Sequence, residues 1–105
     1  MIVSTTFSAE PYEIGENLGL VFGITSRSRN IASTFGAGLK AVVGGNIGAF
    51  EKLAVETRDE SMNKLIQHAS SIGADAVVGL RFDTETIGDT MSTVVAYGTA
   101  VKFKR

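Results

Sequence analysis

The C-terminal third of the chain holds two strand-like stretches that are apolar on both sides, and this feature constrains the fold more than any motif. In each stretch, large apolar residues alternate with small ones rather than with polar ones. In the first stretch, one side holds Ala76, Val78, Leu80 and Phe82, and the other side holds Val77, Gly79 and Arg81. In the second stretch, one side holds Val95, Tyr97, Val101 and Phe103, and the other side holds Val94, Ala96, Gly98 and Ala100. An antiparallel sheet with one face in water would alternate apolar with polar residues. We therefore expect helices to cover one face and a second copy of the chain to cover the other.

The remaining periodicities predict one α+β domain over residues 1–105, without linkers or repeats. In chain order we expect a short strand over 2–6, a strand over 18–28, a helix from Asn30 to the Gly44-Gly45 pair, a helix over 48–72, and a hairpin of strands over 75–88 and 90–105. In the second strand, Leu18, Leu20, Phe22 and Ile24 share one side. The longer helix carries a stripe of Phe50, Leu53, Ala54, Thr57, Ser61, Leu65, Ala69 and Ile72, with Gly73 as its C-cap.

Composition excludes several classes of protein. Ten basic and eleven acidic residues give a formal net charge of -1, so no electrostatic footprint for nucleic acid is present. The chain has no cysteine, which excludes disulfides, thiolate catalysis and zinc sites built on cysteine. No signal peptide and no apolar run of membrane-spanning length is visible. These features predict a cytoplasmic protein without a membrane partner.

Three glycines, Gly44, Gly45 and Gly48, stand just ahead of the longer helix and resemble a phosphate loop at first sight. A phosphate-binding loop follows a strand, whereas we expect a helix before this one. The segment also lacks the P-loop lysine and the G-x-G-x-x-G spacing. We therefore interpret these glycines as a structural corner between two helices.

Candidate metal ligands are few. His68 is the only histidine, and no second ligand stands three or four residues away on its helix. Glu56, Asp59 and Glu60 bring three carboxylates onto neighbouring turns, but basic residues are interleaved with them, and the Glu60–Lys64 spacing favours an ion pair. Asp83 belongs to an acidic group near the hairpin tip whose spacing matches no calcium loop. A solvated, ion-paired helix face explains Glu56, Asp59 and Glu60 without a ligand, and His68 is interpreted as a polar residue at the edge of the apolar stripe.

Two further groups of residues are interpreted as structural or interface positions. Arg58 falls close to the apolar stripe of the longer helix, so we expect it to be partly buried and paired with a carboxylate. Gly79 and Gly98, together with Ala96 and Ala100, are small enough to let a neighbouring subunit approach the sheet.

The order of these motifs resembles the YbjQ-like family. The residues that carry the resemblance are Ser4-Thr5-Thr6, Gly19, Asn30-Ile31, Gly44-Gly45, Gly48-Ala49, Glu51-Lys52, Arg58, Gly73 to Gly79, and Gly98 to Val101, so it covers nearly the whole chain. That family is labelled heavy-metal-binding and its function is unknown. The resemblance implies a dodecin-like β-α-β-β subunit of two layers, with an antiparallel sheet and extra short strands, assembled as a ring of five copies.

Sequence and resemblance together predict a homo-oligomeric ring, most simply a pentamer, with a binding or scaffolding role. One alternative is a metal-binding protein whose site forms between subunits, with His68 or the acidic residues as ligands. A second is an enzyme with an inter-subunit site, for which Arg58, His68 and Asp83 are the candidates. The sequence contains no recognisable catalytic constellation, so no catalytic residue is assigned and an enzyme is the less favoured class. The sequence identifies no cofactor. The expected partner is another copy of the chain, and a metal ion or small ligand is a possible second partner.

Overall fold

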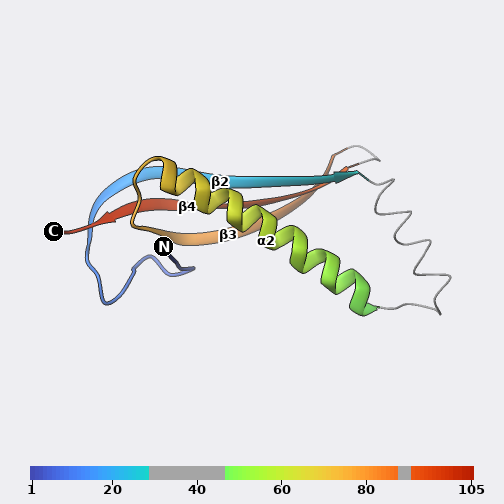
Figure 1. The fold of residues 1–105 in the computed structure, drawn as a ribbon, viewed down its shortest axis with the longest axis horizontal. Coiled ribbons are helices and arrows are strands. Elements are labelled where there is room, and N and C mark those ends of the chain that lie inside the picture. Colours follow the sequence, from blue (N-terminus) through green and yellow to red (C-terminus); the bar gives the residue numbers. More distant parts are fainter. Residues whose placement is uncertain (29–46, 88–90) are drawn as a thin grey trace.

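The computed structural model describes residues 1–28, 47–87 and 91–105. Its elements are β1 (Ile2–Val3), β2 (Ile14–Ser28), α2 (Ile47–Ser71), β3 (Ala76–Ile87) and β4 (Met91–Phe103), arranged as in Figure 1. The sheet has the strand order β1-β3-β4-β2. β1 runs parallel to β3, while the pairs β3–β4 and β2–β4 are antiparallel. The expectation of an α+β fold is confirmed, but the sheet is mixed rather than antiparallel, because the N-terminal strand joins it beside β3.

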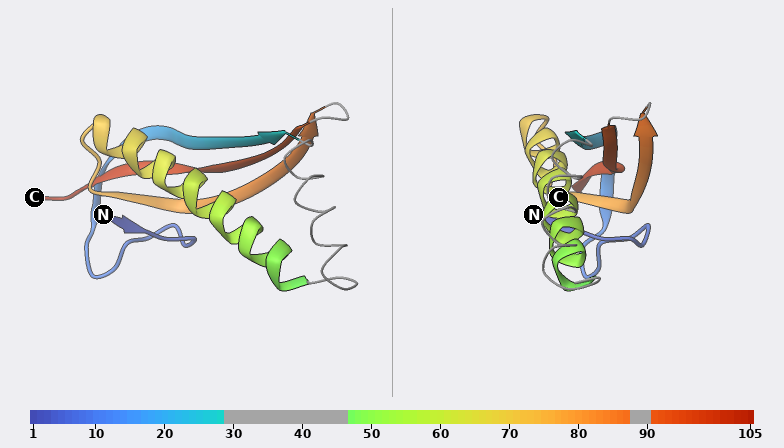
Figure 2. Two further views of the ribbon diagram at one scale, coloured as in Figure 1. Left: turned by 45° about the vertical axis from the view of Figure 1, so that its right-hand side comes forward. Right: turned by 90° about the vertical axis from the view of Figure 1, so that its right-hand side faces the viewer.

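The helix α2 lies on one face of this sheet, as the end-on view in Figure 2 shows, and it crosses the strands diagonally in Figure 1. The main core lies between them and contains Val21, Leu65, Ala69, Val77, Leu80, Ala96 and Ala100. The closest approach is at Gly23, where a Cβ atom would collide with the backbone oxygen of Ser61. A glycine at this point of β2 therefore lets α2 rest directly on the strand.

The predicted stripe of α2 is confirmed over its central turns. Thr57, Ser61, Leu65 and Ala69 are all buried. Ala54 and Ile72, which we also expected in the stripe, are exposed instead, Ile72 by 41%. The helix ends at Ser71, and Gly73 with φ of 79° reverses the chain, so Ile72 already lies in the turn. The amide of Ala74 donates to the carbonyl of Ala69 across this turn, as expected for a glycine C-cap.

A β-bulge at Gly79 interrupts the alternation of β3. Val78 lies opposite Thr99 and Arg81 opposite Tyr97, so Gly79 and Leu80 together face the single residue between those partners. Gly79 has φ of 63°, which suits glycine and is the usual conformation at this kind of bulge. The prediction that Ala76, Val78, Leu80 and Phe82 share one face is therefore wrong. Leu80 and Phe82 pack with the main core under α2, whereas Ala76 and Val78 belong to a second cluster.

That second cluster lies under the chain's own N-terminal segment. Ala9, Ala76, Val78 and Val101 are buried together, with Ile2 and Phe103 packed against them. Tyr12 stacks on Phe103 with ring centroids 4.5 Å apart. The expectation that nothing in this chain covers the second face is thus wrong at this end of the sheet.

Several predicted features fall outside the described residues: the helix from Asn30, the glycines Gly44 and Gly45, and the Gly88-Asp89 turn. Within the described residues, no helix combines the length and hydropathy that a membrane-spanning helix requires.

Candidate functional site

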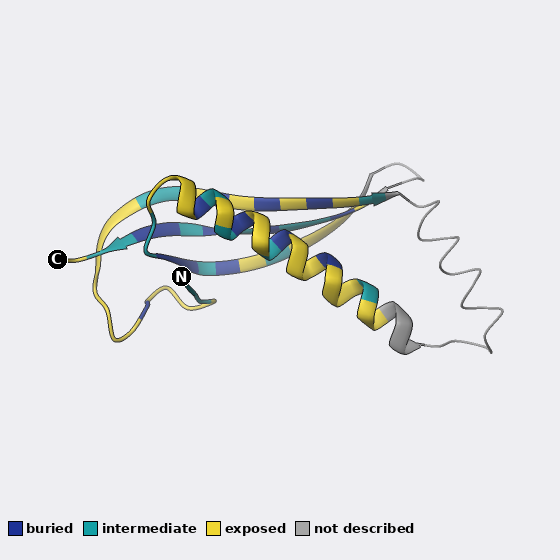
Figure 3. Cartoon of the chain, in the orientation of Figure 1, coloured by how far each residue is buried: buried dark blue, intermediate teal, exposed yellow. Residues whose placement is uncertain are grey.

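A row of large apolar side chains lies open on β2. Leu20 is 66% exposed, and Phe22 and Ile24 are each 44% exposed. The residues between them, Val21 and Gly23, face α2 and are buried, so β2 alternates between buried and exposed bands in Figure 3. The three side chains therefore lie on the sheet face opposite the helix, and we call them the apolar row.

The row continues onto the neighbouring strand. The register pairs Leu20 with Thr99, Phe22 with Tyr97 and Ile24 with Val95. Residues paired across two antiparallel strands point to the same face. Val95, Tyr97 and Thr99 are each partly exposed there. This part of the sheet thus presents a mainly apolar surface that α2 does not cover.

The free edge of β2 beside this row is closed by two side chains from α2. β2 stands at the end of the strand order, so none of the described strands pairs with its outer backbone groups. The amide of Phe22 donates to Nδ1 of His68 at 3.3 Å, and Nζ of Lys64 donates to the carbonyl of Ile24 at 2.9 Å. The rings of Phe22 and His68 also meet edge to face, 5.2 Å between centroids. Side chains that occupy edge groups in this way block the addition of another strand.

The candidate metal ligands have separate positions. His68 binds the edge of β2, as just described, and Glu60 pairs with Arg27 at 2.8 Å. Arg27 also donates to the hydroxyl of Thr57 at 3.0 Å, which fixes this ion pair between β2 and α2. Glu56 is exposed on α2, and Asp83 is exposed on β3. Among the residues that the structure describes, no three acidic or histidine side chains form a group able to hold a metal ion.

Two local expectations on α2 require correction. Arg58 pairs with a carboxylate, that of Asp59 at 3.1 Å, but its side chain is 53% exposed rather than partly buried. It follows the buried Thr57 by one residue, and one step along a helix turns a side chain by a large angle away from the covered face. The expected pair between Glu60 and Lys64 is replaced by contacts to β2, since both side chains reach across to that strand.

The candidate interface glycines of the sheet meet atoms of their own chain. A Cβ atom on Gly98 would lie 2.7 Å from Cγ1 of Val77, and one on Gly79 would lie 2.9 Å from the ring of Phe7. Both positions therefore make room for intrachain contacts. Gly48 lies in α2, while Gly44 and Gly45 are outside the described residues.

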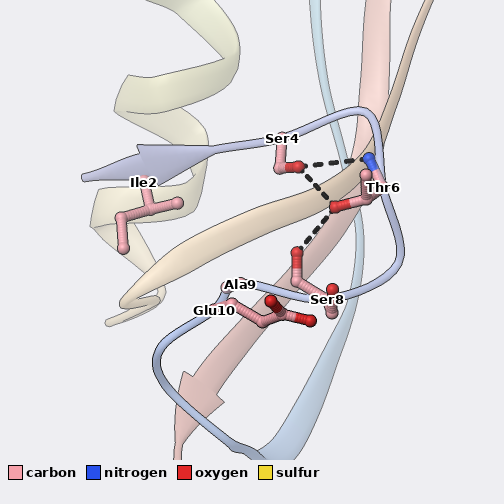
Figure 4. A pocket seen from close by; sticks show the side chains of 6 residues that line it. All are labelled: Ile2, Ser4, Thr6, Ser8, Ala9 and Glu10. Carbon is pink, nitrogen blue, oxygen red and sulfur yellow. Dashed lines mark hydrogen bonds between the residues drawn. The ribbon is translucent and has the colours of Figure 1, made fainter.

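A pocket that we did not predict lies along the N-terminal segment. The segment follows β3 through three backbone hydrogen bonds, in which Ser4 donates to Val77, Leu80 donates to Ser4, and Gly79 donates to Thr6. The pocket has a volume of about 270 Å³. Ile2, Ser4, Thr6, Ser8, Ala9 and Glu10 line it, as Figure 4 shows. The alternation of hydroxyl residues from Ser4 to Ser8 was the available signal, but we interpreted residues 2–6 only as a short strand.

Comparison with known proteins places the chain in a family. A family model described as "Putative heavy-metal-binding" matches residues 1–104. A protein named UPF0145 from Enterococcus faecalis is 51% identical over 105 residues, covering 98% of this chain and 99% of its own. Another UPF0145 protein, from Lactobacillus gasseri, is 48% identical over 103 residues, covering 98% and 94%.

A solved structure has the same fold. It is a crystal structure from Pediococcus pentosaceus, described as a protein with unknown function that belongs to the DUF74 family. The superposition covers 99% of this chain and 98% of the other, with a TM-score of 0.66 at 17% sequence identity. At this identity the likeness shows the fold alone.

Proposed function

Because this chain belongs to the YbjQ-like family, we propose that it functions as a closed homo-oligomeric ring with a binding or scaffolding role. The number of subunits, five, comes from the family resemblance. The observation that carries the proposal is the apolar row of Leu20, Phe22 and Ile24, which stands open on the sheet face opposite α2.

The exposed row is costly for a monomer. Burying one Leu, Ile or Phe side chain completely is worth about 1.5 to 3 kcal/mol. With Leu20 exposed by 66% and Phe22 and Ile24 by 44% each, covering all three would contribute roughly 2 to 5 kcal/mol per chain. A second copy is the partner that is always present at equal concentration, and most soluble oligomers are homo-oligomers.

The shape of the chain supports the same proposal. Its radius of gyration is 17.0 Å and its extents are 57 × 26 × 17 Å. A compact domain of this length has a radius of gyration of about 13 Å. A long, thin molecule buries little of its own apolar surface, so contacts with neighbouring copies would supply burial that the single chain lacks.

The side-chain contacts at the edge of β2 limit how a second copy of the chain could pack against this strand. His68 and Lys64 already occupy the outward backbone groups of Phe22 and Ile24. A neighbouring chain would therefore cover the face of the row rather than add a strand beside it at this point. Within the described residues of one chain, His68 and the acidic candidates have separate positions, so the alternative metal site would need ligands from more than one copy.

The test is a pair of charge substitutions compared by analytical ultracentrifugation and native mass spectrometry. Leu20→Glu places a charge in the apolar row, and we expect it to dissociate the oligomer. Val55→Glu is the matched control, since Val55 is an apolar side chain on α2 with 46% exposure. It should leave the subunit number unchanged. A wild-type chain that stays monomeric and folded up to millimolar concentration would contradict the proposal.

A further inference from the structure

The hydrogen bonds inside the N-terminal pocket fix which groups it offers to a ligand. The hydroxyl of Thr6 donates to the carbonyl of Ser8 at 2.9 Å, so its single proton is used. In the 2.6 Å contact between the Ser4 and Thr6 hydroxyls, Ser4 must then be the donor. Ser4 Oγ also accepts the backbone amide of Thr6 at 3.1 Å. Both hydroxyl protons and that amide are thereby engaged within the segment (Figure 4).

Apart from the Ser8 hydroxyl, what the polar side chains of the pocket leave free is a set of acceptors. A hydroxyl has two lone pairs, so Ser4 Oγ and Thr6 Oγ1 each keep one, and the Ser8 carbonyl keeps one as well. The carboxylate of Glu10, which extends toward Ser8 in Figure 4, adds two oxygens and the only charge among the lining side chains. Among the side chains that line the pocket, the Ser8 hydroxyl is the one group with a proton that no hydrogen bond within the described residues uses.

Cationic side chains do not line this pocket. Arg81 comes near the segment, but its Nη1 donates to the carbonyls of Thr5 and Leu80 at 3.1 and 2.7 Å. Its guanidinium lies 5.9 Å from the ring centroid of Phe7. An anion entering the pocket would therefore meet the Glu10 carboxylate, which repels it, and no cationic side chain among the lining residues.

We propose that this pocket binds a primary ammonium group carried on a short aliphatic stem. An ammonium has three donors and no acceptor, which complements Glu10 and the oxygens of Ser4, Thr6 and Ser8. Ile2 and Ala9 supply the apolar part of the lining, where the stem would lie. A volume of about 270 Å³ exceeds what a bare ion needs. Calcium ions are held by six to eight oxygens, commonly from several carboxylates, and this pocket has one carboxylate.

The proposal is tested by titrating the ¹⁵N-labelled protein with n-butylammonium chloride while following the amide resonances of residues 4–10. We expect saturable shifts confined to that segment. n-Butanol, a neutral molecule of similar shape, should give much weaker shifts, and potassium chloride at equal ionic strength should give none that saturate.

Two variants of equal charge complete the test. Glu10→Gln removes the carboxylate from the pocket and should weaken binding about tenfold, the effect of losing one charge-assisted hydrogen bond. Glu10 is exposed, so the substitution should leave the fold intact. Glu13→Gln is the matched control, because the Glu13 side chain is 78% exposed and does not line the pocket. It should leave the affinity unchanged.

Four results would overturn the assignment: no saturable shifts, equal binding of n-butanol, equal loss in both variants, or binding of acetate at these residues. Tighter binding of calcium or cadmium chloride at the same amides would overturn the choice of an organic ammonium. The inference does not depend on the proposed ring, since the titration reports on this segment whatever the subunit number.

Discussion

Two glycines with positive φ illustrate how single residues set the local structure. Gly19 has φ of 100° with open space where a Cβ would stand, whereas Gly79 has φ of 63° with the ring of Phe7 at 2.9 Å from that point. The same backbone requirement therefore has different consequences at the two positions. At Gly19 a side chain would meet conformational strain alone, and at Gly79 it would also displace an aromatic ring.

We predict that Gly79→Ala lowers the free energy of unfolding by about 2 to 3 kcal/mol, because strain in the left-handed region adds to the contact with Phe7. Gly19→Ala, with strain alone, should cost about 1 kcal/mol. Urea unfolding at one fixed protein concentration measures both values. Equal losses in the two variants would show that the Phe7 contact has no energetic weight.

At the scale of elements, the sequence predicted β2, α2, β3 and β4 because their periodicities are long and strong. The facing of β3 was predicted wrongly because the extra residue at Gly79 places every later side chain on the face opposite to the one that strict alternation predicts. A glycine inside a strand pattern is itself a signal of a bulge. The role of the N-terminal segment was missed for a different reason: its cover over Val78 and Val101 depends on contacts between distant parts of the chain.

The candidate sites were predictable to different degrees. The shared face of Leu20, Phe22 and Ile24 followed from their alternation in the sequence. Leu18, which we predicted on the same face, packs against the main core instead, because the register of β2 shifts between Asn17 and Gly19. The pocket did not, because the donor and acceptor roles of Ser4 and Thr6 depend on where the segment folds back against β3. The contacts of His68 and Lys64 with the β2 backbone were equally hidden, since backbone acceptors and donors leave no trace in residue types.

The hydrogen bond between His68 of α2 and the Phe22 amide of β2 gives a prediction at the scale of elements. In His68→Ala the Phe22 amide loses its acceptor, which should cost about 1 kcal/mol of local stability. Hydrogen exchange of the Phe22 amide, measured by NMR, should become several-fold faster. Gln67→Ala alters an exposed neighbour on the same helix and serves as the control. Unchanged exchange at Phe22 in the His68 variant would contradict the role of this contact.

At the scale of the whole molecule, assembly and stability should be linked. If the proposed ring is the stable form, unfolding also dissociates it, so the thermal midpoint should rise with protein concentration. The wild-type midpoint should show this rise, whereas a monomeric Leu20→Glu chain should have a lower midpoint that is independent of concentration. Differential scanning calorimetry over a wide concentration range measures both. A wild-type midpoint that does not depend on concentration would count against a dissociating assembly.

The bulge on β3 can also be understood as an insertion of one residue. If Gly79 were deleted, Leu80 would stand opposite Gly98, and the pairs Val78–Thr99 and Arg81–Tyr97 would be kept. Every other side chain of β3 would still point to its present face. The packing of α2 on the sheet therefore does not require the additional residue. The N-terminal segment does need it, since Gly79 donates its amide to Thr6 and leaves room for Phe7. One inserted glycine thus adds nothing to the pairing of β3 with β4, but it provides one of the three backbone hydrogen bonds that hold the pocket-bearing N-terminal segment on β3.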